Sequence, residues 1–254
     1  MPGQMDLFGD CDVPELSGLP LTAVAAAVKA AVWTGFSLVG VPPLSARNYE
    51  AVMAALETLM VGEAVSVDQK RLLAGMPGWP GLEAWAVARD PRTFMRSIAL
   101  TQHARRLRGA GIEVTNDAEL TAYYTPASVI EAIWRALQGY GFTGGNVLEP
   151  SAGTGRFLGY CPVALRAASK FVVVEVDPAS AKIAEAVYGE HERIICAGFQ
   201  DCVLPAQFDV AVGNVPFGNF ALYDKEVGGG RALVHDFIIT KSLRKLRPGG
   251  VALF

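Results

Sequence analysis

The chain has 254 residues, of which 51% are hydrophobic and 19% are charged, a balance that excludes a disordered chain and indicates a folded one. The formal net charge of −3 at pH 7 argues against a strongly basic, dedicated nucleic-acid-binding domain but leaves local basic surfaces open. The length suits one large domain or two modest ones, each able to bury a core.

Cysteines and histidines are few and scattered along the chain. Three histidines, and four cysteines without a C-x-x-C pair, predict no metal site. Residues 1–10 are acidic and lack the basic and apolar parts of a leader, so the scattered cysteines predict a cytoplasmic location. The apolar stretch 21–33 contains Lys29 and is too short to span a bilayer, so we expect a buried helix there and no membrane association. The cysteines are Cys11, Cys161, Cys196 and Cys202.

Residues 1–115 predict a mostly helical N-terminal region. Helical periodicity marks 48–60 and 93–108, and each stretch is long enough for an ordinary globular helix. Residues 75–81 read Gly-Met-Pro-Gly-Trp-Pro-Gly, a composition that predicts turns and no regular element.

Six arginines crowd one segment of this region, with Asp90 as the only acid among them. One interpretation is a helix face that contacts nucleic-acid phosphates, which would position DNA without reading its sequence. The other is an ordinary solvated face. We expect Trp79 and Trp85, which precede the segment, in the core rather than stacked on bases. The arginines are Arg89, Arg92, Arg96, Arg105, Arg106 and Arg108.

From residue 116 onward, apolar strands alternate with helices, which predicts an α/β fold with a parallel sheet covered on both faces. The fifth strand is still running at residue 254, so we expect the domain 116–254 to be C-terminally incomplete and the chain to be a piece of a longer protein. The predicted strands are 146–149, 171–176, 193–196, 208–213 and 251–254, and the predicted helices are 126–138, 179–188 and 232–246.

The turn after the first strand, Glu-Pro-Ser-Ala-Gly-Thr-Gly at 149–155, predicts a nucleotide site. Gly153 and Gly155 let backbone N–H groups approach a ligand closely, at the sheet edge where such ligands bind. An NAD fingerprint needs a third glycine where Leu158 stands, and no P-loop Gly-Lys-Ser/Thr follows. S-adenosylmethionine fits better, because Glu149 can face its ammonium group and the turn its carboxylate. The alternative is a turn that binds nothing.

The second strand supports a nucleoside ligand. Glu175 lies 20 positions after Gly155, and a carboxylate at such a strand end can accept both ribose hydroxyls. Val176 would then lie against the adenine ring. Asp177 precedes Pro178 and is expected to cap the next helix; the alternative is that Glu175 also serves only as a cap.

The fourth strand ends in Asn214-Val215-Pro216-Phe217, which resembles the Asn/Asp-Pro-Pro-Tyr/Phe signature of the amino-methyltransferases. The resemblance implies a Rossmann-like, S-adenosylmethionine-dependent methyltransferase sheet. The Asn214 side-chain oxygen and the Val215 carbonyl can accept hydrogen bonds from an exocyclic amine and free its lone pair. Pro216 stiffens the turn, and Phe217 offers a face for an extruded base. Val215 replaces the commoner proline, but the group required is a backbone carbonyl.

Two further segments fall in register with this family. Tyr124-Thr125-Pro126 resembles its Tyr/Phe-Thr-Pro segment, which implies contacts to the methionine end of the donor. After the third strand the family has an acidic residue that contacts the adenine amino group, followed by an aromatic residue. Here Gly198 stands where the family has the acidic residue, and Phe199 stands where it has the aromatic one. Asp201 is the alternative acidic residue. The predicted donor-binding residues are Tyr124, Thr125, Glu149, Ser151, Gly153, Gly155, Glu175, Val176 and Phe199.

Over residues 70–254 the order of these motifs is similar to the methylase modules of very large phage- and plasmid-borne methylase–helicase proteins, some linked to antirestriction. The Gly-Trp-Pro-Gly turn at 78–81 and His235-Asp236-Phe237 add to the likeness. It implies a helicase-like region C-terminal to this segment, and DNA as the partner, with a flipped-out adenine methylated at N6. His235 and Asp236 have no predicted role beyond a cap or a structural contact.

Other interpretations stay open. The same chemistry could act on cytosine N4, on RNA or on a protein glutamine. The chain could also be a catalytically inactive donor-binding module that serves antirestriction as an interaction partner.

Overall fold

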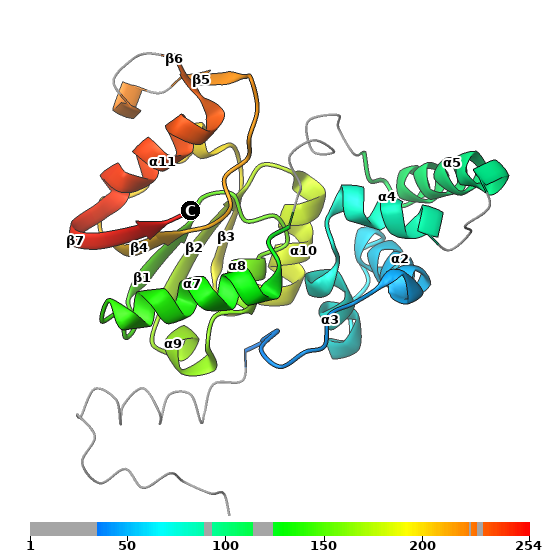
Figure 1. Ribbon diagram of the computed structural model, residues 1–254, viewed down its shortest axis with the longest axis horizontal. Coiled ribbons are helices and arrows are strands. Elements are labelled where there is room, and N and C mark those ends of the chain that lie inside the picture. Colours follow the sequence, from blue (N-terminus) through cyan, green and yellow to red (C-terminus); the bar gives the residue numbers. More distant parts are fainter. Residues whose placement is uncertain (1–34, 89–92, 114–123, 224, 228–230) are drawn as a thin grey trace, which may run out of the picture.

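Two parts lie side by side in the structure, a sheet covered by helices and a separate helical region next to it (Figure 1). The helix predicted at 21–33 and the boundary predicted between residues 115 and 116 lie outside the described residues. The structure, a computed structural model, describes residues 35–88, 93–113, 124–223, 225–227 and 231–254.

The predicted parallel sheet is confirmed. Its five strands follow the order β3-β2-β1-β4-β7, and every neighbouring pair is parallel. Leu148 in the central strand pairs with Val172 on one side and Ala211 on the other. Such apolar strands fit a sheet that is buried on both faces. The strands are β1 (Asn146–Glu149), β2 (Lys170–Glu175), β3 (Arg193–Cys196), β4 (Phe208–Val212) and β7 (Leu246–Leu253).

The strand β7 begins earlier than predicted. The Pro-Gly-Gly segment at 248–250 lies inside it, where the register against β4 shifts: Phe208 pairs with Leu246, whereas Val210 pairs with Val251. The first glycine of the segment has a φ of +83°, which glycine adopts without strain. The chain therefore bulges and returns to the sheet instead of turning into it.

Helices cover the two faces of the sheet. Val147 and Leu148, neighbours in β1, belong to different hydrophobic clusters, because successive strand side chains point to opposite faces. The helices from α7 to α10 pack into the cluster of Val147, and α11 packs into that of Leu148. The helices predicted at 126–138, 179–188 and 232–246 are confirmed, the helix that follows the glycine turn is a single turn, and the short helix α9 was not predicted. The helices of this part are α7 (Ala127–Gly139), α8 (Arg156–Gly159), α9 (Val163–Ala167), α10 (Pro178–Tyr188) and α11 (Val234–Lys245).

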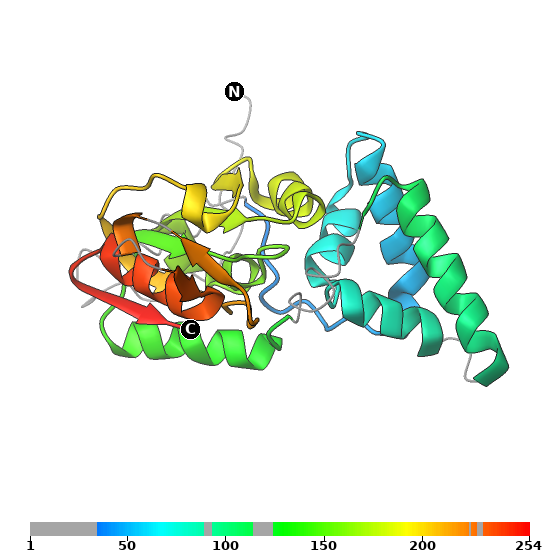
Figure 2. The same ribbon diagram turned by 90° about the horizontal axis from the view of Figure 1, so that it is seen from above.

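The helical region comprises residues 46–109 and lies beside α10 (Figure 2). It confirms the helices predicted at 48–60 and 93–108. Its core joins that of the sheet, since Met53 and Leu73 belong to the same cluster as Val147. The elements are the short 3-10 helix η1 (Ala46–Asn48), α2 (Tyr49–Met60), α3 (Val67–Gly75), α4 (Trp79–Ala88) and α5 (Thr93–Gly109).

Residues 75–81 were predicted to hold no regular element, and this is wrong at both ends, because Gly75 is the last residue of α3 and a further helix begins at Trp79. The helix α4 begins there, with Pro80 in its first turn, a position that needs no backbone donor. The preceding α3 was not predicted. Its start is set by a capping box, in which Ser66 accepts from the Gln69 backbone and the Gln69 side chain accepts from the Ser66 backbone.

A second, two-stranded antiparallel sheet precedes α11 and was not predicted. It pairs β5 (Ala221–Tyr223) with β6 (Arg231–Leu233). The predicted helix 232–246 accordingly begins at Val234. Among the described helices, none is both long and apolar enough to cross a membrane.

Candidate functional site

A cavity of about 560 Å³ opens at the carboxyl ends of β1, β2 and β4, the edge at which ligands bind in open α/β sheets. The loops after these strands and the 3-10 helix η2 (Phe199–Asp201) line it. Nine of the predicted site residues lie in its lining: Tyr124, Thr125, Ser151, Gly153, Glu175, Val176, Phe199, Asn214 and Pro216. Glu149, Gly155, Val215 and Phe217 lie outside the lining.

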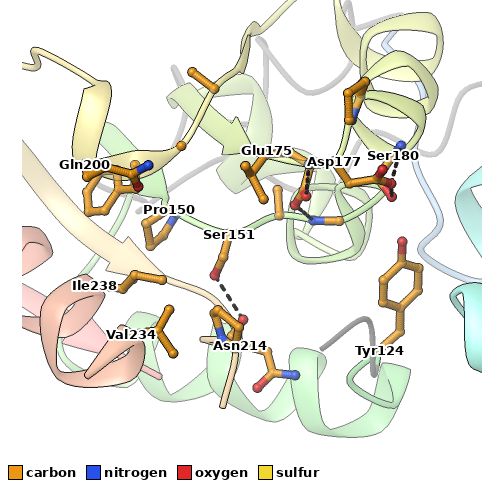
Figure 3. A pocket seen from close by; sticks show the side chains of 18 of the residues that line it. Tyr124, Pro150, Ser151, Glu175, Asp177, Ser180, Gln200, Asn214, Val234 and Ile238 are labelled. Atoms are coloured by element: carbon orange, nitrogen blue, oxygen red, sulfur yellow. Dashed lines mark hydrogen bonds between the residues drawn. The ribbon is translucent and has the colours of Figure 1, made fainter. Parts of the chain in front are cut away.

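Residues with different predicted roles lie on different sides of the cavity. Figure 3 shows Gln200 and Tyr124 on opposite sides, with Glu175 and Ser151 between them. In Figure 3, Asn214 lies next to Ser151 and on the same side of the cavity as Val234, the first residue of α11. The residues predicted to contact the adenine, the ribose and the methionine end of the donor therefore line one cavity.

The glycines of the first turn are required by packing. Gly153 has a φ of +57°, and a Cβ there would lie 2.7 Å from the Tyr124 ring. Gly155 has a φ of +79°, and a Cβ there would lie 2.8 Å from the Tyr188 ring. Gly153 thus lets Tyr124 close one wall of the cavity, whereas Gly155 faces the core.

The carboxylate of Glu175 is held between two loops. Its Oε2 accepts from the backbone N–H of Gly153 at 2.6 Å, and its Oε1 accepts from that of Asp177 at 2.8 Å. Burial raises the pKa of this carboxyl. Each oxygen has a second lone pair, so the group can still accept hydrogen bonds from a ligand in the cavity.

Asp177 caps α10, as predicted. Its Oδ2 accepts from the backbone N–H of Ser180 at 2.9 Å and from the Ser180 hydroxyl at 2.6 Å. The same oxygen accepts from the indole N–H of Trp79 at 3.0 Å. Trp79 is buried as predicted, but it also lines the cavity, a role that no sequence pattern indicates.

Glu149 does not reach the cavity. It is fully buried, and neither carboxyl oxygen has a hydrogen-bond partner in the described part of the chain. Burial raises its pKa to about 8, so the neutral acid prevails at pH 7. The predicted contact to an ammonium group requires a carboxylate at the cavity wall, and the structure does not place one at this position.

The Asn214 turn meets the first turn directly. The Ser151 hydroxyl donates to the Asn214 backbone carbonyl at 3.0 Å (Figure 3). Asn214 is exposed at the cavity, whereas the Val215 side chain is buried in the cluster of Leu148. Phe217 is 71% exposed. Its ring lies 5.9 Å from that of His235, tilted by 38°.

Tyr124 lines the cavity at the opposite side from Gln200. Its hydroxyl is buried and has no hydrogen-bond partner among the described residues. Burial raises its pKa to about 12, so it stays a neutral donor and acceptor. A buried hydroxyl without a partner is costly, and a polar ligand in the cavity would remove that cost.

The 3-10 helix η2 supplies Phe199 and Gln200 to the lining. The Lys241 ammonium lies 5.2 Å from the Phe199 ring centre and donates to the Gln200 carbonyl at 3.1 Å. Asp201, the predicted alternative acid, is exposed and outside the lining, where it accepts from the Gln200 side-chain amide at 3.0 Å. Gln200, which was not predicted, therefore presents its amide to the cavity instead.

One arginine of the segment 89–108 forms ion pairs within the molecule. Arg106 forms ion pairs with Glu57 at 2.9 Å and Glu50 at 2.6 Å, so it ties α5 to α2. Arg105 and Arg108 are exposed. Arg89 and Arg92 lie outside the described residues. Within the described residues, no three His, Cys, Asp or Glu side chains gather as a metal site would require.

The chain is similar in sequence to two curated proteins, and it spans only a small part of each. It is 32% identical over 137 residues to Defense against restriction protein B of Escherichia phage P1, covering 52% of this chain and 6% of that protein. It is 32% identical over 95 residues to the Type II methyltransferase M.CvrRI of Paramecium bursaria Chlorella virus XZ-6E, covering 37% of this chain and 24% of that protein. No protein-family model matches the chain.

Two solved structures resemble it at low sequence identity. One is a protein of Listeria monocytogenes assigned to the class I S-adenosylmethionine-dependent methyltransferases, with 18% identity, 91% of this chain and 71% of that chain covered, and a TM-score of 0.47. The other is the type I restriction-modification system methyltransferase subunit of Streptococcus thermophilus, with 15% identity, 91% and 73% covered, and a TM-score of 0.43.

Proposed function

We propose that this chain is a catalytic domain that transfers a methyl group from S-adenosylmethionine to the N6 amino group of adenine in DNA. The observation that carries the proposal is the meeting of two turns in one cavity. The Ser151 hydroxyl, in the predicted donor turn, is bonded to Asn214, in the predicted acceptor turn. The methyltransferase named among its sequence relatives supports the same activity.

The cavity suits the chemical groups of this donor. Glu175 offers carboxylate oxygens for two ribose hydroxyls, and Phe199 offers an aromatic wall for the adenine. The Gln200 side-chain amide donates to Asp201, so its oxygen is left for the adenine amino group. At the far side, the Tyr124 hydroxyl lacks a partner, which a polar methionine end would supply.

The acceptor turn has the groups that the transfer needs. When bound, the donor supplies an electrophilic methyl group on a sulfonium. Asn214 holds the attacking amine through its side-chain oxygen, and the Val215 carbonyl accepts the second amine hydrogen. The buried Val215 side chain and Pro216 fix this turn, so both acceptors are preorganised. The exposed Phe217 ring offers a stacking face for the flipped base.

The choice of DNA adenine rests on the sequence relatives and on the resemblance of the motifs. One relative is named for defense against restriction and the other is a Type II methyltransferase, and both names belong to the biology of DNA modification. The resemblance of the motifs further implies a helicase-like region C-terminal to this domain.

The test is methyl transfer by the purified chain with labelled donor and with adenine-containing DNA, matched RNA, or protein. We expect N6-methyladenine in the hydrolysed DNA. Asn214→Ala should lower the transfer rate by at least about 100-fold, the size typical of losing one preorganised polar group, while donor binding persists. Label in N4-methylcytosine, RNA or glutamine would overturn the adenine assignment. Donor binding without transfer to any acceptor would overturn catalysis.

A further inference from the structure

We propose that Trp79 of the helical region is a positioning residue of the donor pocket, so that the helical region forms one wall of it. The inference rests on the proposed function, because it takes S-adenosylmethionine as the ligand of the cavity. The sequence predicts Trp79 only as a core residue, and none of the predicted donor contacts comes from the helical region.

The contact of Trp79 is a charge-assisted hydrogen bond at the cavity wall. Its indole N–H donates to the Asp177 carboxylate at 3.0 Å, and the indole is 2% exposed. Both residues line the cavity. Indole donates only one hydrogen bond, so Asp177 sets the orientation of the ring, and the ring in turn holds Asp177 in place.

Asp177 also contacts Glu175, the residue predicted to bind the ribose. Its carboxylate is directed at Trp79 and Ser180, while its backbone N–H donates to Glu175 Oε1 at 2.8 Å. The other oxygen of Glu175 accepts from Gly153 at 2.6 Å. An unbroken series of hydrogen bonds therefore joins the helical region to the glycine turn through the carboxylate that faces the ligand.

A second contact joins the same segment to the helix that follows the glycine turn. The Arg156 guanidinium, at the start of α8, approaches the carbonyls of Gly75 and Met76 at 3.4 and 3.5 Å. The segment between Met76 and Trp79 is tight, since Gly78 has a φ of +83° and a Cβ at Gly81 would lie 2.6 Å from Pro77. The helical region is thus held at two points around the donor turn, which fixes where Trp79 stands.

The test compares Trp79→Phe, which keeps an aromatic ring and removes the N–H, with Trp85→Phe, a half-buried tryptophan in the same helix. Each variant and the wild type are titrated with S-adenosylmethionine and with S-adenosylhomocysteine, by calorimetry and by intrinsic fluorescence. We expect Trp79→Phe to bind both ligands about tenfold more weakly, as expected for loss of a hydrogen bond to a charged group. It should also lose the ligand-dependent fluorescence change, and Trp85→Phe should keep both signals.

A structural role alone would lower the melting temperature without changing the donor affinity of the folded variant, so thermal unfolding is measured in parallel. In turnover, the donor KM should rise about tenfold while kcat stays within twofold. Should Trp79→Phe fail to fold, Asp177→Asn keeps the shape of the cap and weakens the same bond, and it should show the same loss of affinity. Unchanged donor affinity beside a wild type that binds would overturn this role alone, whereas a folded wild type that binds neither ligand would overturn the proposed function as well.

Discussion

Two buried carboxyl groups near the donor turn differ in what surrounds them. Glu175 accepts a backbone N–H on each oxygen, whereas neither oxygen of Glu149 is bonded within the described chain. Burial raises the pKa of both groups. Only Glu175 combines access to the cavity with donors that compensate its charge, so we propose the ligand contact for Glu175, whereas Glu149 lies in the core.

Replacing Glu149 should change how stability depends on pH. Its pKa is raised to about 8 in the folded chain, against about 4.3 in an unfolded one. Between these values the unfolded chain has lost the proton that the folded chain keeps, so the free energy of unfolding falls as pH rises from about 4.5 to about 8. Glu149→Gln removes this loss, and we expect it to be about 4–5 kcal/mol more stable than the wild type at pH 8 and equally stable near pH 4.5.

Urea unfolding at both pH values measures the difference, with the exposed Glu190→Gln as control. An equal stability difference at both pH values would show that Glu149 is ionised in the folded chain.

Gln200 is expected to contribute donor affinity but no chemistry. Gln200→Ala removes the oxygen assigned to the adenine amino group, and one neutral hydrogen bond is worth about 1 kcal/mol. We expect the donor KM to rise about fivefold with kcat unchanged. Gln207→Ala, an exposed glutamine outside the cavity lining, is the matched control. A fall in kcat with an unchanged KM would contradict the assignment.

At the scale of elements, the strands of the parallel sheet could be predicted from the sequence, whereas the short strands β5 and β6 and the start of α4 could not. The run 171–174 consists of a phenylalanine and three valines, and such an apolar, mostly β-branched run suits a strand buried on both faces. In β5 and β6, three residues each provide too few positions for an alternating pattern to be recognised. The start of α4 was missed because proline and glycine usually mark turns, although proline is tolerated in a first helical turn.

The donor turn offers a test of close packing at one glycine. Gly153→Ala should both strain a backbone at φ +57° and push on the Tyr124 ring 2.7 Å away. Gly62→Ala is the matched control, because Gly62 has a φ of +87° and nothing within 4 Å of its would-be Cβ. We expect the control to lose about 1 kcal/mol of stability and to keep donor affinity.

The Gly153 variant should lose more stability than the control and bind the donor at least about tenfold more weakly. Chemical denaturation and calorimetry measure the two effects. Equal losses of stability and equal donor affinities in the two variants would show that the Tyr124 ring can move without weakening donor binding.

At the scale of the whole molecule, one hydrophobic cluster runs through the helical region and one face of the sheet, from Met53 and Trp79 to Val147 and Tyr188. The two predicted regions are thus packed on a common core. The sequence could not show this, because the contacts span long separations: Trp79 and Asp177 are 98 residues apart. Periodicity reports only local structure, so it identifies Trp79 as buried without indicating what it contacts.

A common core predicts that both regions unfold together. We expect one thermal transition, which a donor at about 100 times its Kd should raise by about 5 °C, since such binding adds about 2.7 kcal/mol. Differential scanning calorimetry with and without donor measures this. Two separate transitions, of which only one moves with the donor, would contradict it.

The hydrogen bond between Ser151 and the Asn214 carbonyl joins the predicted donor turn to the predicted acceptor turn, so binding at one turn can change the affinity at the other. Any ordering of the first turn by one ligand is felt at the second, and linkage requires the effect to be mutual. If donor increases the affinity for the acceptor strand by some factor, that strand increases the affinity for donor by the same factor. Neither ligand then needs to bind first, and each would raise the equilibrium affinity of the site for the other.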